Sequence, residues 1–501
     1  MAERHGFHEA HFTSLPCQSN VYGLTSLMYP GGIGKVLVAP LKDKVVSLEY
    51  MTDQERGKLK PVAKEIHFAG IPDDAEIISI DSYKRLKKDG GHIIGITFTK
   101  DAQTENPTHN LNIYAPWEKG SEYVLENIAQ TWTNIELDFT PFFLCHTEIM
   151  EDGKREMVFL LTGSDKQIHM YRDTVQTWNE VGSRFSEHPI GGSFPEFADL
   201  PCVALWLDCR TLGDRKRVSV VGCRSGYIRL SIVDTKSNEI VKQWETHHDS
   251  AITCCRLFTR TTHVESASSW LQKRQERILD DERGPHSQEE GNCDYSLLVT
   301  SALEVAAVYG NVLQDGFQHQ SILPQSDVFD CALCTSVADL DWDGYNELLV
   351  GTYGQVLLVY KYISNQEAGS QVIQSDSFEK EPDSKDDLPE EAASSTSGGE
   401  GGSGKEGEEE GGGGGGCGGG GGGGGGRSGK GGAGEGHYEL LWSRSFAHPL
   451  LALNHFDLTG DGLQEIVVLS TRGLHILQHN LEKAAQVCLE GLRQLLPEEP
   501  T

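Results

Sequence analysis

The residues best suited to bind an ion lie in a short acidic turn within Val337 to Tyr360, VADLDWDGYNELLVGTYGQVLLVY. Four carboxylates occupy positions 1, 3, 5 and 9 of one loop: Asp339, Asp341, Asp343 and Glu347. The sixth position is Gly344, where a sharp bend favours a residue without a Cβ. This spacing is the first part of a calcium-binding loop. The turn is therefore a candidate calcium site.

Metal binding has a simpler alternative at this turn. The loop differs from an EF-hand, because position 12 is Val350 and the flanking residues favour strands over helices. Short acidic side chains also cap strand-to-strand turns by accepting hydrogen bonds from the backbone amides of the turn. The sequence leaves both interpretations open, so we assign no metal and no other cofactor.

A second copy of the unit lies at His455 to Gln478, HFDLTGDGLQEIVVLSTRGLHILQ. It keeps Asp457, Asp461 and Glu465, but Thr459 replaces the carboxylate at position 3. Fewer charged ligands generally weaken calcium binding. Two copies of one supersecondary unit indicate a repeat architecture.

Five further units with the same outline of apolar strands and polar turns precede these two. They run over Val21–Tyr50, Ala75–Tyr114, Phe142–Tyr171, Cys202–Val233 and Ala251–Tyr309. Each unit offers three strands, and linking strands such as KPVAKEIHF and YELLWSRSF supply a fourth. About seven units of four short strands predict an all-β, seven-bladed β-propeller. We expect the N-terminal HFTSL to supply the missing outer strand of the last blade.

The repeat pattern also predicts the domain boundaries. We expect blades one to six within residues 1–363, with an insertion at 263–293 in blade five, and the last blade at 437–480. Residues 364–436 hold 15 acidic and 5 basic residues and long glycine runs, which predicts a disordered insertion. Apolar residues at three- and four-residue spacing predict an amphipathic helix at 481–497, which either packs on the propeller or faces a partner.

Composition excludes several classes of function. The net charge of -31 argues against nucleic-acid binding, which needs a basic face. The opening MAERHGFHEAHF has no apolar signal region, and no apolar run reaches the length of a membrane span. We therefore expect a reducing compartment for the twelve cysteines, which disfavours an extracellular adhesion role.

Several segments resemble known proteins. DLDWDGYNELLVGTYG and DLTGDGLQEIVV resemble the FG-GAP repeats of integrin-α-like propellers. QSNVYGL, IPDDAEIISID, FTPFFLCHTE, GCRSGYIRL and SFAHPLLALNHFDLTGDGLQE are similar to the kaptin family, and the likeness spans Gln18 to Glu465.

The kaptin resemblance implies a subunit of the KICSTOR assembly, paired with another FG-GAP propeller protein. It implies a peripheral location on the cytoplasmic face of the lysosomal membrane. There the assembly holds the GATOR complex that acts on Rag GTPases, and restrains the TOR growth kinase when amino acids are scarce. The family is also described as actin-associated, in lamellipodia and stereocilia.

We expect a non-enzymatic scaffold with no catalytic residues, because no nucleophile motif, P-loop, dinucleotide fingerprint or complete zinc spacing is present. One alternative is an actin-binding module, which would cosediment with F-actin by itself. A second is a propeller hydrolase, which requires two carboxylates that converge in a pocket.

Overall fold

The structure is a computed structural model that describes residues 6–29, 34–42, 44–53, 58–86, 91–116, 124–151, 154–173, 185–213, 215–262, 294–364 and 436–495. The insertion expected at 263–293, and all but the two end residues of the one at 364–436, lie outside these ranges. The chain divides into two units, Met1–Tyr362 with His437–Thr501, and Ile363–Gly436. The first unit contains every strand described below, except that Ile363, the last residue of one of them, falls in the second unit.

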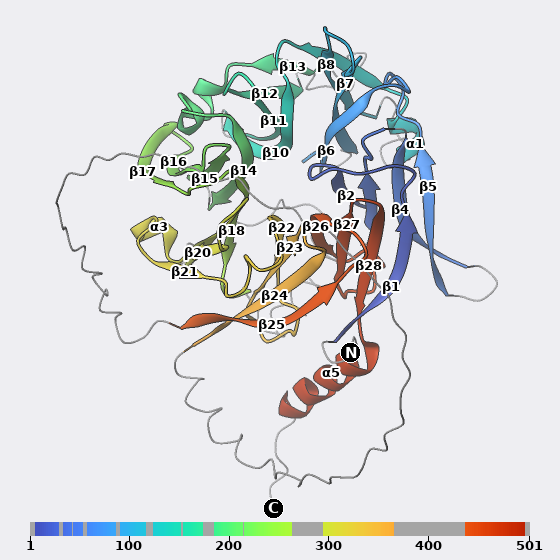
Figure 1. Cartoon of the computed structure of the whole chain (residues 1–501), viewed down its shortest axis with the longest axis vertical. Coiled ribbons are helices and arrows are strands. Elements are labelled where there is room, and N and C mark those ends of the chain that lie inside the picture. The colour runs from blue at the N-terminus through green and yellow to red at the C-terminus, as the bar shows by residue number, and fades with distance from the viewer. Residues whose placement is uncertain are drawn as a thin grey trace, which may run out of the picture. The chain divides into compact units, whose positions relative to one another are not determined.

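Seven four-stranded sheets form this unit and stand around a central axis (Figure 1), which confirms the predicted seven-bladed β-propeller. Blade one contains β2 (Leu24–Met28), β3 (Gly34–Val38), β4 (Val45–Thr52) and β5 (Leu59–Ile66). Blade two contains β6 (Glu76–Lys84), β7 (His92–Lys100), β8 (Thr108–Tyr114) and β9 (Trp132–Leu137). Blade three contains β10 (Pro141–Glu151), β11 (Lys154–Gly163), β12 (Ile168–Asp173) and β13 (Phe185–His188).

The remaining blades follow the same order from the innermost strand outward. Blade four contains β14 (Ala204–Leu212), β15 (Lys216–Cys223), β16 (Tyr227–Asp234) and β17 (Glu239–His247). Blade five contains β18 (Ile252–Thr259), β19 (Tyr295–Ser301), β20 (Ala307–Tyr309) and β21 (Gln320–Ile322). Blade six contains β22 (Ala332–Ala338), β23 (Glu347–Thr352), β24 (Val356–Ile363) and β25 (His437–Ser445).

Blade seven joins the two ends of the chain. Its first three strands are β26 (Leu450–Phe456), β27 (Glu465–Ser470) and β28 (Gly473–His479), and its outer strand is β1 (Phe7–Ser14). β1 pairs antiparallel with β28, from Phe7 opposite His479 to Ser14 opposite Gly473. The expectation that an N-terminal strand completes the last blade is therefore confirmed.

β25 corrects one predicted boundary. We expected the last blade to begin at residue 437, but β25 is the outer strand of blade six. The last blade instead begins at β26, and residues 365–435 connect the third and fourth strands of blade six. The physical reason is that a linking strand pairs with the sheet that precedes it.

Apolar contacts between neighbouring blades hold the ring together. The described residues form seven buried clusters, one at each junction between adjacent blades. One of them packs Val36 and Leu48 of blade one against Val467 and Ile476 of blade seven, so the ring has no open end. Middle strands are covered on both sides by other blades, which explains why β7 is buried at every residue except Lys100. Outer strands such as Glu239–His247 face solvent and are mostly polar.

Short helices lie in the connections. They are α1 (Leu125–Ile128), α3 (Val312–Asp315) and the 3-10 turns η2 (Ile190–Gly192) and η3 (Pro195–Phe197). The predicted C-terminal helix is α5 (Leu481–Leu495), and the Asn480 side chain caps it by accepting a hydrogen bond from the Glu482 N–H at 2.9 Å. No helix in the described part of the chain combines the length and apolar character of a membrane span.

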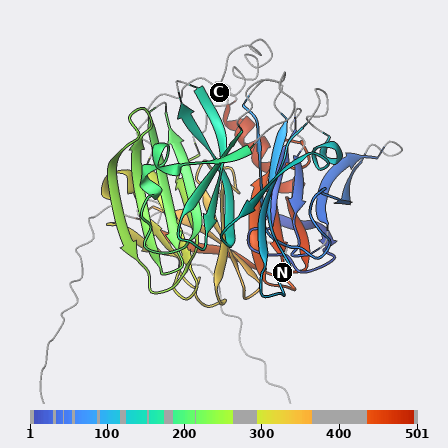
Figure 2. The same ribbon diagram turned by 90° about the horizontal axis from the view of Figure 1, so that it is seen from above.

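The antiparallel order of the strands decides which turns share a face. The strands run between the two faces of the propeller (Figure 2). Turns from first to second strands and from third to fourth strands therefore lie on one face, which we call the insertion face. The insertion face carries the turns 339–346 and 457–464. The chain also leaves the described structure there, after Thr262 and after Ser364.

Closure by β1 makes a prediction about stability. Phe7 is 5% exposed and its ring lies 4.1 Å from that of His479, whereas Phe12 on the same strand is 46% exposed. Phe7→Ala is expected to lower the free energy of unfolding by about 3–5 kcal/mol, because it leaves a cavity where the Phe7 ring packs at the closure of the ring of blades. The matched control Phe12→Ala is expected to cost about 1 kcal/mol or less. Urea unfolding measures both, and equal losses would contradict the closure.

Candidate functional site

The acidic turn of blade six connects β22 to β23. Two of its carboxylates accept hydrogen bonds from backbone N–H groups of the same turn. Asp339 Oδ2 accepts a hydrogen bond from the Gly344 N–H at 3.0 Å, and Glu347 Oε2 accepts one from the Leu340 N–H at 2.7 Å. Gly344 has a φ of 89°, so the bend falls at the glycine as the spacing predicts. These bonds are the turn-capping pattern that the sequence offered as the alternative to metal binding.

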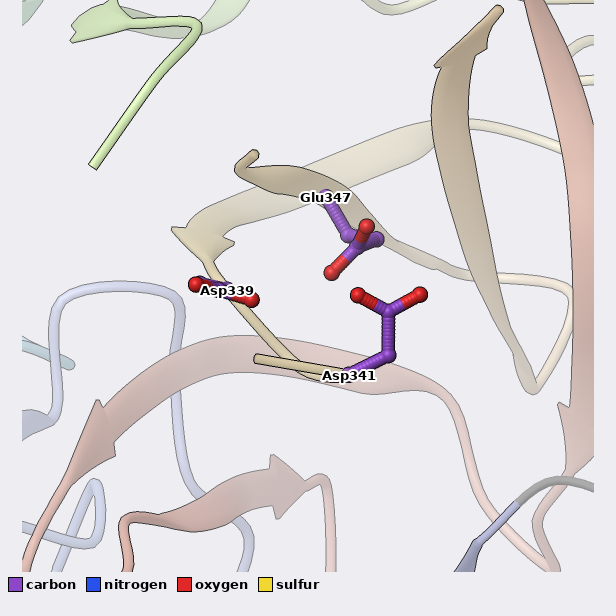
Figure 3. Close-up of side chains that lie close together, drawn as sticks. All are labelled: Asp339, Asp341 and Glu347. Carbon is purple, nitrogen blue, oxygen red and sulfur yellow. The ribbon is translucent and has the colours of Figure 1, made fainter. Parts of the chain in front are cut away.

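Lys361 brings a positive charge into the same turn. Its Nζ lies 2.5 Å from Asp341 Oδ2, 2.6 Å from Asp343 Oδ2 and 3.1 Å from Glu347 Oε1. Figure 3 shows the carboxylates of Asp341 and Glu347 facing each other across this space. The Lys361 side chain is 15% exposed and that of Glu347 is fully buried. The ammonium group therefore supplies inside the turn the charge that a bound cation would supply.

The pKa shifts agree with this arrangement. Burial raises the pKa of Glu347 to about 7, in spite of its hydrogen bond from Leu340 and its pairing with Lys361. Burial would lower the pKa of Lys361, but the three surrounding carboxylates outweigh it and raise that pKa above its usual value. Lys361 therefore stays charged over the whole physiological range.

Calcium fits this turn only in part. Oxygen atoms of Asp339, Asp341 and Glu347 lie within 4.8 Å of one another, and Asp339 Oδ1 is buried without a hydrogen-bond partner among the described residues. Those features suit a cation. However, calcium takes six to eight oxygen ligands, and Lys361 already contacts two of the three grouped residues as well as Asp343. Asp339 is the one carboxylate of the grouped three that Lys361 does not contact.

Blade seven provides an internal comparison for Lys361. In blade six, Leu348 pairs with Tyr360, and one residue further along the same register Glu347 lies opposite Lys361. In blade seven, Ile466 pairs with Leu477, and the next position places Glu465 opposite Gln478. Gln478 therefore takes the place of Lys361, just as Thr459 takes the place of Asp341. Thr459 and Gln478 both donate hydrogen bonds to Glu465 Oε1, at 3.1 and 3.2 Å. The second turn thus loses one carboxylate and one ammonium together and satisfies its buried glutamate with neutral donors.

The acidic turn of blade six also anchors the chain just before the 263–293 segment. The Thr262 N–H donates to the Gly344 carbonyl at 2.9 Å, and the Asn346 N–H donates to the Arg260 carbonyl at 2.8 Å. The Thr262 hydroxyl donates to Asp339 Oδ2 at 3.3 Å. The end of blade five is therefore fixed against the turn.

The other side of the turn meets the ring closure and the start of α5. The ring of Trp342 lies 4.5 Å from that of His479, which in turn lies 4.1 Å from Phe7. Asn480 follows directly, and its N–H donates to the Gly6 carbonyl at 2.7 Å. Burial lowers the pKa of His479 to about 4, so this stack contains a neutral imidazole at physiological pH. The turn thus contacts the site where the N-terminal strand and the C-terminal helix meet.

The axis of the propeller contains a cavity of about 490 Å³. The hydrolase alternative requires two carboxylates there, but Asp81 is the one carboxylate among the described residues that line it. His146 Nδ1 lies 2.7 Å from Asp81 Oδ2, so that carboxylate is already paired. The described lining of the cavity therefore lacks the second carboxylate that a glycoside hydrolase needs.

Seven four-stranded sheets, closed by an N-terminal strand, define this protein as a seven-bladed β-propeller. A family model described as KICSTOR complex protein kaptin matches residues 7–390 and 416–489. The KICSTOR complex protein kaptin of Mus musculus is 38% identical over 486 residues, which cover 97% of this chain and 91% of the mouse protein. The chain therefore belongs to the kaptin family of KICSTOR complex proteins.

The solved structures that align with this chain are less similar to it in sequence than the mouse protein is. A chain in the crystal structure of BBS1N in complex with ARL6DN aligns with a TM-score of 0.45 and 8% identity, over 95% of this chain and 98% of that chain. A chain in the structure of apo ctPRC2 in an autoinhibited state aligns with a TM-score of 0.28 and 11% identity, over 45% and 39%. Likenesses at this level do not define a function.

The comparison between the two turns predicts that Asp341→Thr restores part of the stability that Lys361→Gln loses. Lys361→Gln is expected to cost on the order of 3 kcal/mol of unfolding free energy, because it leaves the buried Glu347 without its cation. Asp341→Thr alone is expected to cost less than about 1 kcal/mol, since Asp341 is 51% exposed. The double variant reproduces the pattern of Thr459 and Gln478 and is expected to be more stable than Lys361→Gln. Urea unfolding of the four proteins measures the coupling.

A control variant and a chelator experiment complete this test. Lys64→Gln removes a lysine that is 43% exposed and pairs with Glu49, and it is expected to change stability little. Adding a chelator is expected to leave the melting temperature of the unmodified chain unchanged. A fall of several degrees would show that an ion stabilises the Asp339 turn and would contradict the role of Lys361.

Proposed function

We propose that this chain is a non-catalytic scaffold subunit of the KICSTOR assembly, and that it helps to hold the GATOR complex at the lysosomal surface. In this role it pairs with a second FG-GAP propeller protein. It acts on the cytoplasmic face of the lysosomal membrane as a peripheral protein, and it restrains TOR signalling when amino acids are scarce. Membership of the kaptin family supports the proposal.

One structural observation carries the scaffold role. Three segments start beside the acidic turn of blade six: residues 263–293 after Thr262, residues 365–435 shortly after Lys361, and α5 after His479. All three leave the propeller at the insertion face. A turn that contacts the described residues where three segments begin is suited to binding several partners at once.

The first part of α5 offers an apolar contact surface. Ala484 is buried, whereas Leu481 is 67% exposed and Leu489 is 53% exposed. A spacing of eight residues places these two leucines on one stripe of the helix. Exposed apolar side chains on one helical stripe favour docking in a groove of a partner. We assign this stripe to the second propeller subunit.

Affinity recovery from cells tests the proposal. The full chain is expected to recover the other KICSTOR subunits and GATOR, and Leu481→Glu with Leu489→Glu is expected to reduce recovery of the second propeller at least tenfold. Gln486→Glu, an exposed polar position on the same helix, is the matched control and is expected to recover partners normally.

Two outcomes would count against the proposal. Failure of the unmodified chain to recover any KICSTOR subunit would overturn the scaffold role. Cosedimentation of the purified chain with F-actin, combined with that failure, would favour the actin-binding module instead. Normal recovery by the double leucine variant would remove α5 as the docking element.

A further inference from the structure

The axial cavity has a charge opposite to that of the whole chain. Its lining residues include Lys84, Arg256, and the Asp81–His146 pair, whereas the chain carries a net charge of -31. Burial would lower the pKa of His146, but Asp81 outweighs it and raises that pKa. Asp81 is paired with His146, and the two basic side chains Lys84 and Arg256 outnumber this one carboxylate among the described lining residues. Such an internal surface favours anions over cations.

Arg256 is the side chain best placed to bind an anion in this cavity. It lies on the innermost strand β18, is half-buried, and donates one long hydrogen bond from Nε to Thr335 Oγ1 at 3.4 Å. Its other guanidinium N–H groups meet no acceptor within the described ranges, and no carboxylate in those ranges pairs with it. A half-buried guanidinium with free donors suits bidentate binding of a phosphate or carboxylate group.

Different side chains line the two ends of the cavity. The innermost strands all run in the same direction along the axis, so the position of a residue in its strand gives its depth. Tyr22 lies two residues before β2, and Phe143 and Trp206 are the third residues of β10 and β14; the centroids of these rings lie 4.5–6.4 Å apart. Met28 and Lys84 are the last residues of β2 and β6, and Met28 is 41% exposed. The mouth therefore lies at the insertion face.

Size and polarity also suit a small ligand. The volume of about 490 Å³ falls within the range of roughly 300–1,000 Å³ that small-molecule sites occupy. Besides Arg256, the wall presents short polar side chains such as Ser26, Ser336 and Asn454. The Asn454 amide donates to Ser26 Oγ at 3.2 Å, which fixes both side chains at the wall. A positioned cation among fixed polar groups is the usual composition of a specific anion site.

We propose that the axial cavity binds a small organic anion bearing phosphate or carboxylate groups, with Arg256 as its main contact. The anion enters from the insertion face, passes Lys84 and rests against the guanidinium above the aromatic floor. The site is separate from the acidic turn and from α5. Its occupancy therefore does not depend on the proposed scaffold role.

Calorimetric titration of the purified full chain tests this site with inorganic pyrophosphate and, separately, with citrate. Saturable binding of at least one of them is expected, and the better probe identifies the preferred group. Arg256→Gln is expected to weaken that binding at least tenfold. The matched control Arg224→Gln removes an exposed arginine that does not line the cavity, and is expected to bind as the unmodified chain does.

A second variant distinguishes a loss of binding from a loss of folding. Ser336→Leu adds bulk to the cavity wall without removing a charge, and it is expected to abolish binding in a protein that still melts cooperatively. Absence of saturable binding to both anions would overturn the proposal. Unchanged affinity in Arg256→Gln or in Ser336→Leu would also overturn it, because the anion would then bind elsewhere.

Discussion

A ring of sheets is stable only where the last sheet meets the first, and one short strand satisfies this requirement here. β1 supplies the outer strand of blade seven, while Val467 and Ile476 pack against Val36 and Leu48 of blade one. Each blade then has a neighbour on both sides, so no sheet face is left without cover. The buried middle strands, the axial cavity and the fixed geometry of the insertion face all follow from this closure.

Within the ring of blades, the acidic turn of blade six holds a network of ion pairs and contacts the segments that the proposed function depends on. Lys361 pairs with Asp341, Asp343 and Glu347 and supplies a positive charge inside the turn. Because Thr262 bonds to the turn and Trp342 stacks on His479, its shape also fixes where neighbouring segments leave the propeller. A turn that resembles a metal loop can therefore serve as an organising element for partner binding.

The sequence predicts those features that depend on local pairing. Antiparallel strands joined by short turns are visible as repeats, so seven blades and the N-terminal strand were predictable. Of the four carboxylates in the predicted loop, the structure groups Asp339, Asp341 and Glu347. Lys361 was missed, although laying out the hairpin around Gly354 places it opposite Glu347. β25 was assigned to the wrong blade, because a long insertion separates it from β24. The cavity was not predictable, since seven distant strands must share an axis before Arg256 has a defined environment.

Native-state hydrogen exchange tests the closure most directly. If β1 completes the ring, the paired amides of Phe7–Ser14 should exchange only through global unfolding, with the same opening free energy as the middle strands of blades one and seven. If these amides exchange rapidly while the other blades stay protected, the N-terminal strand is a frayed end and the closed ring is contradicted.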